Sequence, residues 1–135
     1  KGAAKAMRQA LEMAQCTPEQ VDLVNCHATS TPVGDRSEII ALKSVFGDQL
    51  KSVSIQSTKS LMGHTLGAAG ANELISAIIE SEESFVHGMP NLDEPDNICE
   101  GLDLKKENHE RKISVIIKNA FGFGGHNATV LYRKA

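Results

Sequence analysis

Apolar residues at helical spacing alternate with short apolar runs along most of this chain, and this alternation restricts its fold more than any other feature. Helical patterns cover residues 2–15, a segment capped by Asp35, and the segment that follows Gly67. Two short apolar runs, at 21–26 and 53–57, have the length of strands and stand between these helices. The alternation predicts an α/β fold in which helices cover a sheet.

The C-terminal part of the chain predicts two further strands. Residues 113–120 and 128–133 are typical of strands, and the glycine-rich sequence FGFGGHN at 121–127 joins them. We expect the two strands to pair antiparallel as a terminal hairpin at one edge of the sheet, which makes the predicted sheet mixed. The preceding residues 87–108 contain prolines, glycines and many acidic side chains, and they predict a long surface connection.

The composition excludes several classes of function. The formal net charge is −3 and lysines and arginines do not cluster, which disfavours a nucleic-acid partner or an anionic membrane surface. No apolar run approaches the length of about 18 residues that a membrane-spanning helix needs. Cys16, Cys26 and Cys99 are odd in number and lack CxxC spacing, so we expect neither a disulfide framework nor a zinc knuckle. They indicate a reducing compartment.

The first residue, Lys1, lies inside a helical pattern, and no methionine or targeting segment precedes it. We therefore interpret residues 1–135 as one packed unit from a longer protein, with any targeting segment outside the fragment. The reducing compartment then points to the cytoplasm, with the mitochondrion and the plastid as alternatives.

Two histidines follow the first two predicted strands. His27 comes directly after the run at 21–26, and His64 lies in a glycine-punctuated loop, five residues after Lys59. Loops at the C-terminal ends of strands are where α/β folds place ligands. Neutral imidazoles donate hydrogen bonds to an oxygen that becomes negative, and a nearby ammonium group helps to keep them neutral. The three side chains therefore suit the stabilisation of an enolate or oxyanion.

Other candidate residues have more than one interpretation. On a helical wheel, Glu73 lies nearly opposite the apolar face formed within residues 74–79, which predicts a solvated carboxylate. Phe121 and Phe123 alternate with glycines, a pattern that fits either a mobile apolar gate or a tight hairpin whose two rings lie in the core. The separations between the histidines match no compact metal-ligand motif, so a metal site is disfavoured.

The loop after the first strand is equally open to two interpretations. Thr29 and Thr31 carry hydroxyls that bind either a ligand or the loop backbone. Cys26 precedes His27 directly, yet adjacent strand residues point to opposite faces. We therefore expect Cys26 to be a buried structural thiol and not the partner of the imidazole.

Three stretches taken together resemble the β-ketoacyl-[acyl carrier protein] synthases of the KAS I/II type. They are NCHATSTPVGD at 25–35, STKSLMGHTLGAAGANE at 57–73 and NAFGFGGHNA at 119–128. Their order and spacing match the family, and the sequence PNLD at 90–93 matches it too. The resemblance implies a thiolase-like layered α/β sandwich made of two similar halves. Residues 1–135 would be the C-terminal half, with the mixed sheet and the terminal hairpin.

The same resemblance implies an acyltransferase of fatty acid biosynthesis that condenses an acyl chain with malonyl-acyl carrier protein and works as a homodimer. The family holds the acyl group on a cysteine of the other half, and no cysteine here matches it, so the isolated fragment is expected to be inactive. No cofactor is implied beyond the phosphopantetheine that the acyl carrier protein brings. A non-catalytic subunit resembling a chain-length factor and a polyketide-type ketosynthase are the alternatives; intact His27 and His64 argue against the first.

By resemblance, four residues of the chain are catalytic. His27 and His64 would bind the malonyl thioester oxygen, promote loss of carbon dioxide and stabilise the enolate. Lys59 corresponds to the active-site lysine of the family. Glu73 corresponds to a buried glutamate, contrary to the helical wheel.

The resemblance also implies the residues that bind substrate. Thr29 and Thr31 would donate hydrogen bonds to the phosphopantetheine arm. Phe123 would be a gating residue whose backbone amide contributes to the oxyanion hole, with Phe121 and Gly124 in the same loop.

Two positions depart from the family pattern. Ala28 stands where glycine is more usual, and His126 stands where the family usually has threonine. We expect the first change to be harmless. The sequence does not predict the effect of the second change on the gate or on the hydrogen bonds of its loop.

Overall fold

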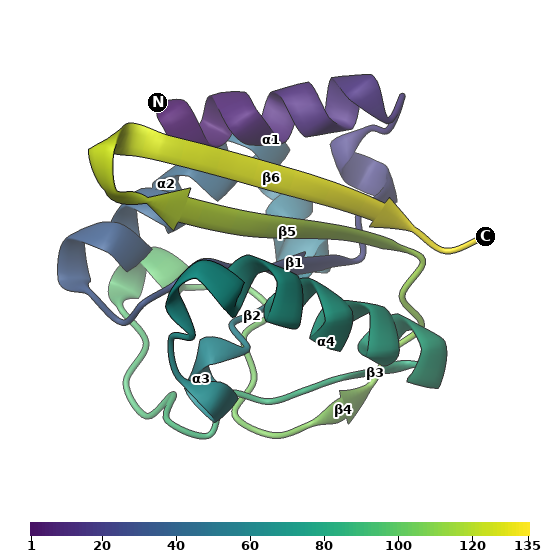
Figure 1. Ribbon diagram of the computed structural model, residues 1–135. Helices are drawn as coiled ribbons and strands as arrows, with labels where there is room; N and C mark the ends of the chain where they lie inside the picture. Colours follow the sequence, from purple (N-terminus) through teal and green to yellow (C-terminus); the bar gives the residue numbers. More distant parts are fainter.

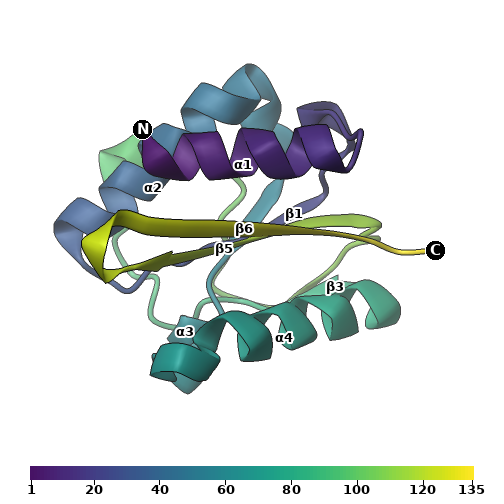
Figure 2. The same ribbon diagram turned by 45° about the horizontal axis from the view of Figure 1, so that its top comes forward.

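A four-stranded sheet with helices on both faces forms the centre of the computed structural model, which describes residues 1–135 (Figures 1 and 2). The strand order is β2-β1-β5-β6, and the strands are β1 (Leu23–Asn25), β2 (Ser54–Gln56), β5 (Val115–Gly122) and β6 (His126–Arg133). β1 pairs in parallel with β2 and β5, whereas β5 and β6 form an antiparallel hairpin. The predicted mixed sheet with its terminal hairpin is therefore confirmed.

The helices form two layers, one on each face of the sheet (Figure 2). One layer contains α1 (Gly2–Met13) and α2 (Pro32–Phe46), and the other contains α3 (Lys59–Met62) and α4 (Ala69–Glu83). Short 3-10 turns occur at Pro18–Gln20, Gly47–Ser52, Leu66–Ala68, Asn97–Cys99 and Phe123–Gly125. No helix combines the length and the apolar run that crossing a bilayer requires.

The hydrophobic core is divided unequally between the two faces of the sheet. The face covered by α1 and α2 carries a cluster of 16 buried residues, among them Met7, Val24 and Leu42. The face covered by α4 carries a cluster of only five buried residues, which includes Leu23 and Ala77. The second face therefore has room for buried polar groups.

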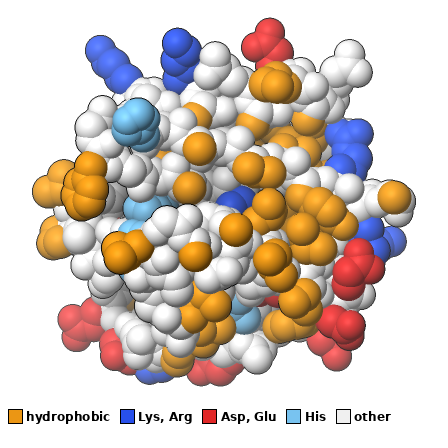
Figure 3. Space-filling view, in the orientation of Figure 1, with side chains coloured by type: hydrophobic (Ala, Val, Ile, Leu, Met, Phe, Trp, Pro, Cys, Tyr) orange, Lys and Arg blue, Asp and Glu red, His pale blue; other side chains and the backbone are white.

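α4 turns its polar side toward the sheet. Glu73 and Glu80 are buried on that side together with Ala77, whereas Ile75 is 56% and Ile79 is 52% exposed. Hydrophobic side chains accordingly gather on the surface over this helix (Figure 3). The helical wheel assumed that the apolar side faces the core, and that assumption is wrong for this helix.

The start of α2 differs from the prediction for a physical reason, whereas its end does not. α2 begins at Pro32, and its N-cap is Thr31, four residues before the expected cap, because proline is well suited to the first helical position. Asp35 instead lies in the first turn, where its Oδ1 accepts a hydrogen bond from the backbone N–H of Thr31 (3.3 Å). α2 ends at Phe46, and Gly47 is its C-cap as expected, with a φ of +56° that disfavours residues with a side chain.

The predicted surface connection at 87–108 is only partly correct. Its start is buried, including His87 and Met89. The segment is framed by β3 (Phe85–Val86) and β4 (His109–Glu110), which pair antiparallel as a small second sheet. The remainder passes the β2 edge of the main sheet, where Asp103 bridges to Ser54, and its 3-10 turn Asn97–Cys99 lies beside α2 (Figure 2).

Candidate active site

The two histidines predicted from the strand exits lie together. The ring centroids of His27 and His64 are 5.6 Å apart with an interplanar angle of 87°, and Phe121 packs on His27 at 5.5 Å. His27 follows β1 closely, but α3 separates His64 from β2, so the expectation that His64 comes directly from a strand is wrong. The rings still meet, since β1 and β2 run in parallel and end at the same edge of the sheet.

A cavity of about 650 Å³ opens at the two histidines. Thr29 and Thr31 line it, and their hydroxyl oxygens are 3.4 Å apart. Phe121 and Phe123 line it from the tip of the hairpin. Four of the five predicted substrate-binding residues therefore border one space. Gly124, the fifth, lies in the same turn with a φ of +74° but is not among the lining residues.

The two phenylalanines of the hairpin tip have different environments. Phe121 is half-buried at the end of β5, whereas Phe123 is fully exposed in the turn that follows. The interpretation that both rings lie in the core is therefore wrong. A gating role for Phe123 stays a prediction.

Glu73 is buried beneath this site, so the prediction of a solvated carboxylate is wrong. Its side chain is 1% exposed, and its two oxygens lie 2.6 Å from the ammonium nitrogens of Lys59 and Lys118. Both lysine side chains are buried as well. The physical reason is the orientation of α4, whose polar side faces the sheet, where two cations compensate the carboxylate.

Sequence reasoning missed Lys118. It lies on β5 directly beside Asn25 of β1, and the side chain of Asn25 donates to the backbone carbonyl of Glu73 (3.1 Å). The one available signal was a charged residue inside an otherwise apolar strand, next to Ile116 and Ile117. Such a residue is rarely buried without a partner of opposite charge.

Sequence reasoning also missed Glu38, which fixes the loop after β1 from the other face of the sheet. Its carboxylate accepts hydrogen bonds from the backbone N–H groups of His27 (3.0 Å) and Ala28 (2.9 Å). The side chain of Asn119 donates a third bond to it (3.0 Å). Burial raises the pKa of Glu38, while these hydrogen bonds oppose that rise. The loop that carries His27 is thus held by a buried acidic group.

The electrostatic environment keeps His27 neutral. Burial, followed by the ammonium groups of Lys59 and Lys118, lowers its pKa to about 4. His64 is fixed differently, because its Nδ1 accepts a hydrogen bond from the backbone N–H of Leu66 (3.1 Å). An imidazole that accepts at Nδ1 carries its proton on Nε2, so Nε2 of His64 is a donor. Both rings are therefore suited to hydrogen-bond an anionic oxygen.

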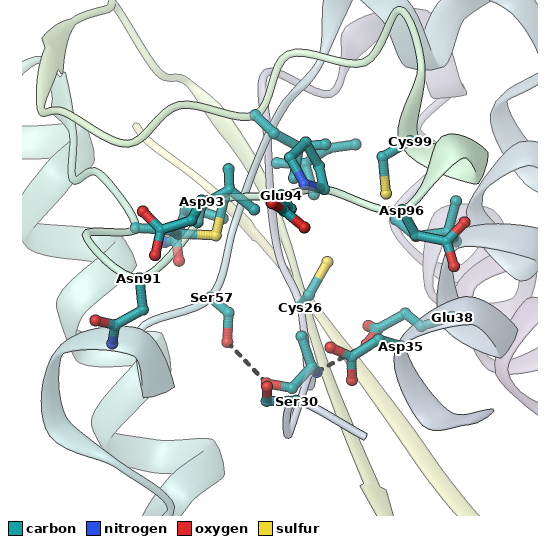
Figure 4. Close-up of a pocket in the computed structure, with 18 residues that line it drawn as sticks. Cys26, Ser30, Asp35, Glu38, Ser57, Asn91, Asp93, Glu94, Asp96 and Cys99 are labelled. Atoms are coloured by element: carbon teal, nitrogen blue, oxygen red, sulfur yellow. Dashed lines mark hydrogen bonds between the residues drawn. The ribbon is translucent and has the colours of Figure 1, made fainter. Parts of the chain in front are cut away.

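A second hollow of about 320 Å³ lies behind the loop after β1 (Figure 4). Cys26 and Cys99 reach it from different elements, and acidic side chains such as Asp35 and Asp96 border it. Cys26 belongs to the main core cluster, and burial raises its pKa well above the ordinary value. The environment of Cys26 fits the expected structural thiol.

His126 lies at the edge of a hollow of about 360 Å³ that His27 and His64 also line. Its side chain is exposed, and it faces Gly122 across the hairpin. No group of three or more histidine, cysteine or acidic side chains has an arrangement that could hold a metal ion.

Comparison with known proteins identifies the family. The sequence profile described as Beta-ketoacyl synthase, C-terminal domain, matches residues 1–93, which is more than half of the chain. The chain belongs to this family. The resemblance to the β-ketoacyl synthases is thereby confirmed.

A curated relative and a solved structure each match nearly the whole of this chain. 3-Oxoacyl-[acyl-carrier-protein] synthase 1 of Escherichia coli (strain K12) is 42% identical over 133 residues, which are 98% of this chain and 32% of the relative. The crystal structure of a β-ketoacyl synthase from Burkholderia phymatum STM815 has a TM-score of 0.91 and 36% identity, and the match covers 98% of this chain and 32% of that one. The chain spans about a third of the length of these relatives.

A third similar structure contains a carrier protein. It is a ketosynthase of a type II polyketide synthase in complex with its acyl-carrier protein, with a TM-score of 0.93 and 32% identity over 98% of this chain and 33% of that one. Ketosynthases therefore share the layered α/β fold of this domain, and the predicted thiolase-like fold is confirmed.

Proposed function

We propose that this β-ketoacyl synthase domain removes carbon dioxide from a malonyl thioester and stabilises the resulting enolate, as part of a 3-oxoacyl-[acyl-carrier-protein] synthase of fatty acid biosynthesis. One observation carries the proposal. His27 and His64 lie ring to ring at the mouth of a cavity, above a carboxylate that two buried lysines hold. This arrangement offers two neutral hydrogen-bond donors in a positively charged surrounding, which is what a developing enolate oxygen requires.

The proposed reaction has two steps. First, the bond between the α-carbon of malonyl and its carboxylate carbon breaks, and its electron pair moves to the α-carbon and the thioester oxygen as carbon dioxide leaves. His27 and His64 donate hydrogen bonds to that oxygen. The enolate carbon then attacks the carbonyl of an acyl thioester, a carbon–carbon bond forms, and the thiolate that held the acyl group departs. The resemblance assigns this thiolate to a cysteine outside residues 1–135.

An acyl carrier protein is the proposed partner, and phosphopantetheine would arrive on it as part of the substrate. Thr29 and Thr31 line the cavity with hydroxyls that suit the amides of such an arm. The relative from E. coli carries the carrier protein in its name, and the similar polyketide ketosynthase was solved with its carrier protein bound. A homodimer and a cytoplasmic location are part of the same proposal.

A polyketide pathway is the alternative to fatty acid biosynthesis, and the similarity to a polyketide ketosynthase favours it. The fold similarity to a polyketide ketosynthase is as high as that to the β-ketoacyl synthase from B. phymatum, and the decarboxylation would be the same in both. A non-catalytic subunit resembling a chain-length factor has less support, because His27, His64 and Lys59 are all present and assembled.

The substitution His64→Ala in the full-length protein tests the proposed function. We expect release of carbon dioxide from malonyl-acyl carrier protein to fall about 100- to 1,000-fold, the usual effect of losing one oxyanion donor. Acylation of the nucleophile should persist. His109→Ala is a matched control, since His109 lies on β4 and does not line the cavity. Near-normal carbon dioxide release from His64→Ala would refute the role assigned to this residue.

A further inference from the structure

Lys118 is a buried cation beneath the candidate active site. Its side chain is 2% exposed, its Nζ lies 2.6 Å from Glu73, and it also donates to the backbone carbonyl of Asn119. Lys118 lies on β5, whereas Lys59 lies on α3 and contacts the other oxygen of Glu73. Three separate elements therefore meet at one carboxylate.

Two lysines share one carboxylate in this cluster. Lys59 and Lys118 lie on the two oxygens of Glu73, and the carboxylate of Glu38 also acts on Lys118. Burial lowers the pKa of Lys118, while the contact with Glu73 opposes that fall. Burying an unbalanced charge destabilises a fold, and a neutral side chain in place of one lysine would leave a balanced ion pair. Glu73 itself therefore needs only one of the two lysines as its counter-charge.

We propose that Lys118 is a positioning residue for the decarboxylation: it holds Glu73 in place and, with Lys59, keeps His27 in the neutral form that donates to the enolate. This inference rests on the proposed function. The two ammonium groups act on His27, so they oppose a positive charge on its ring. The same positive charge favours an anion in the cavity. This anion is the malonyl carboxylate before carbon dioxide leaves and the enolate afterwards.

Lys59 acts on His27 in the same sense as Lys118, and the acidic groups nearby act in the opposite sense. The groups that face His27 from the elements packed around it are Lys59 of α3, Lys118 of β5, His64 of the following loop, Glu73 of α4 and Glu38 of α2. The two acidic groups would favour protonation of His27. The order of the causes that lower its pKa, after burial, is Lys59, Lys118 and His64. Lys118 therefore offsets the carboxylate that it also positions.

The test is Lys118→Met, which replaces the ammonium by an apolar chain of similar shape and leaves the Lys59–Glu73 pair balanced. Lys134→Met is the matched control, because it removes the same charge from a lysine that pairs with Glu82 far along α4. The first readout is the pH titration of the His27 ring, measured by NMR in the full-length protein. The His27 signal is assigned by its loss in His27→Gln. The second readout is the pH profile of carbon dioxide release from malonyl-acyl carrier protein.

In the wild type, His27 should titrate near pH 4. In Lys118→Met we expect this titration and the acidic limb of the rate profile to move up together by about one pH unit, because a nearby positive charge has been removed. Lys134→Met should move neither. If Lys118→Met does not fold, Lys118→Gln gives the same two readouts.

The two readouts separate the inference from the function on which it rests. An unshifted His27 titration in folded Lys118→Met, with only a loss of thermal stability, would overturn the positioning role. A wild-type protein that releases no carbon dioxide would instead refute the proposed function, while the NMR titration would still decide whether Lys118 controls the charge of His27.

Discussion

Glu73 joins three elements through its two ion pairs. Its oxygens connect α4 to Lys59 of α3 and to Lys118 of β5, and its backbone carbonyl accepts a hydrogen bond from Asn25 of β1. Such contacts are short and shielded from water, so each charge depends on the others for compensation. The three charged side chains therefore act as one unit in folding, and their separate substitutions should not be additive.

The substitution Glu73→Gln should lower the free energy of unfolding by about 3–5 kcal/mol, because it leaves two buried ammonium groups without a counter-charge. The double variant Glu73→Gln with Lys118→Met should regain part of this loss, since it removes one of those charges. Urea unfolding of both variants measures the effect. Glu82→Gln is the control, because Glu82 is half-exposed on the same helix and should change stability little. A double variant less stable than Glu73→Gln alone would contradict the account.

At the scale of elements, the ends of the helices and strands are determined by individual residues. α2 stops at Gly47, where φ is +56° and ψ is −136°, and the chain then turns into the 3-10 segment that leads to β2. Residues with a Cβ strongly disfavour this backbone conformation. The path from α2 to β2 thus depends on one glycine, and β2 leads the chain toward the loop of His64.

The substitution Gly47→Ala should lower the free energy of unfolding by about 1–2 kcal/mol through backbone strain. Space is not the cause, because an added Cβ at Gly47 would meet no atom within 4 Å. Gly67→Ala is the matched control, since Gly67 has the same free space but no positive φ. It should be neutral or slightly stabilising. Equal effects of the two substitutions in thermal or urea unfolding would show that strain at Gly47 is not the cause.

At the scale of the molecule, most of the architecture follows from local patterns, but the buried charges do not. Periodicity and glycines indicated the helix and strand order and the terminal hairpin, and strand exits placed His27 and His64 at one site. Periodicity failed for Glu73, because it assumes that the apolar side of a helix faces the nearest sheet. The burial of Lys118 and Glu38 was not predicted, because a buried charge is recognisable only once its partner is known. These partners are distant in sequence.

The outward apolar side of α4 has a consequence for the whole chain. Ile75 and Ile79 are more than half exposed, and hydrophobic side chains gather over the helix in Figure 3. Contiguous apolar surface of this kind drives association. We therefore expect the isolated 135-residue chain to self-associate through α4.

Ile75→Lys with Ile79→Lys should reduce this self-association, measured as the average mass by analytical ultracentrifugation across a range of concentrations. Because both side chains are exposed, the free energy of unfolding of the monomer should change by no more than about 1 kcal/mol. Met13→Lys with Val33→Lys is the control, since these residues are even more exposed but lie on α1 and α2, on the opposite face of the sheet. If the control pair lowers the average mass as strongly as the α4 pair, association is a matter of overall charge and not of the apolar side of α4.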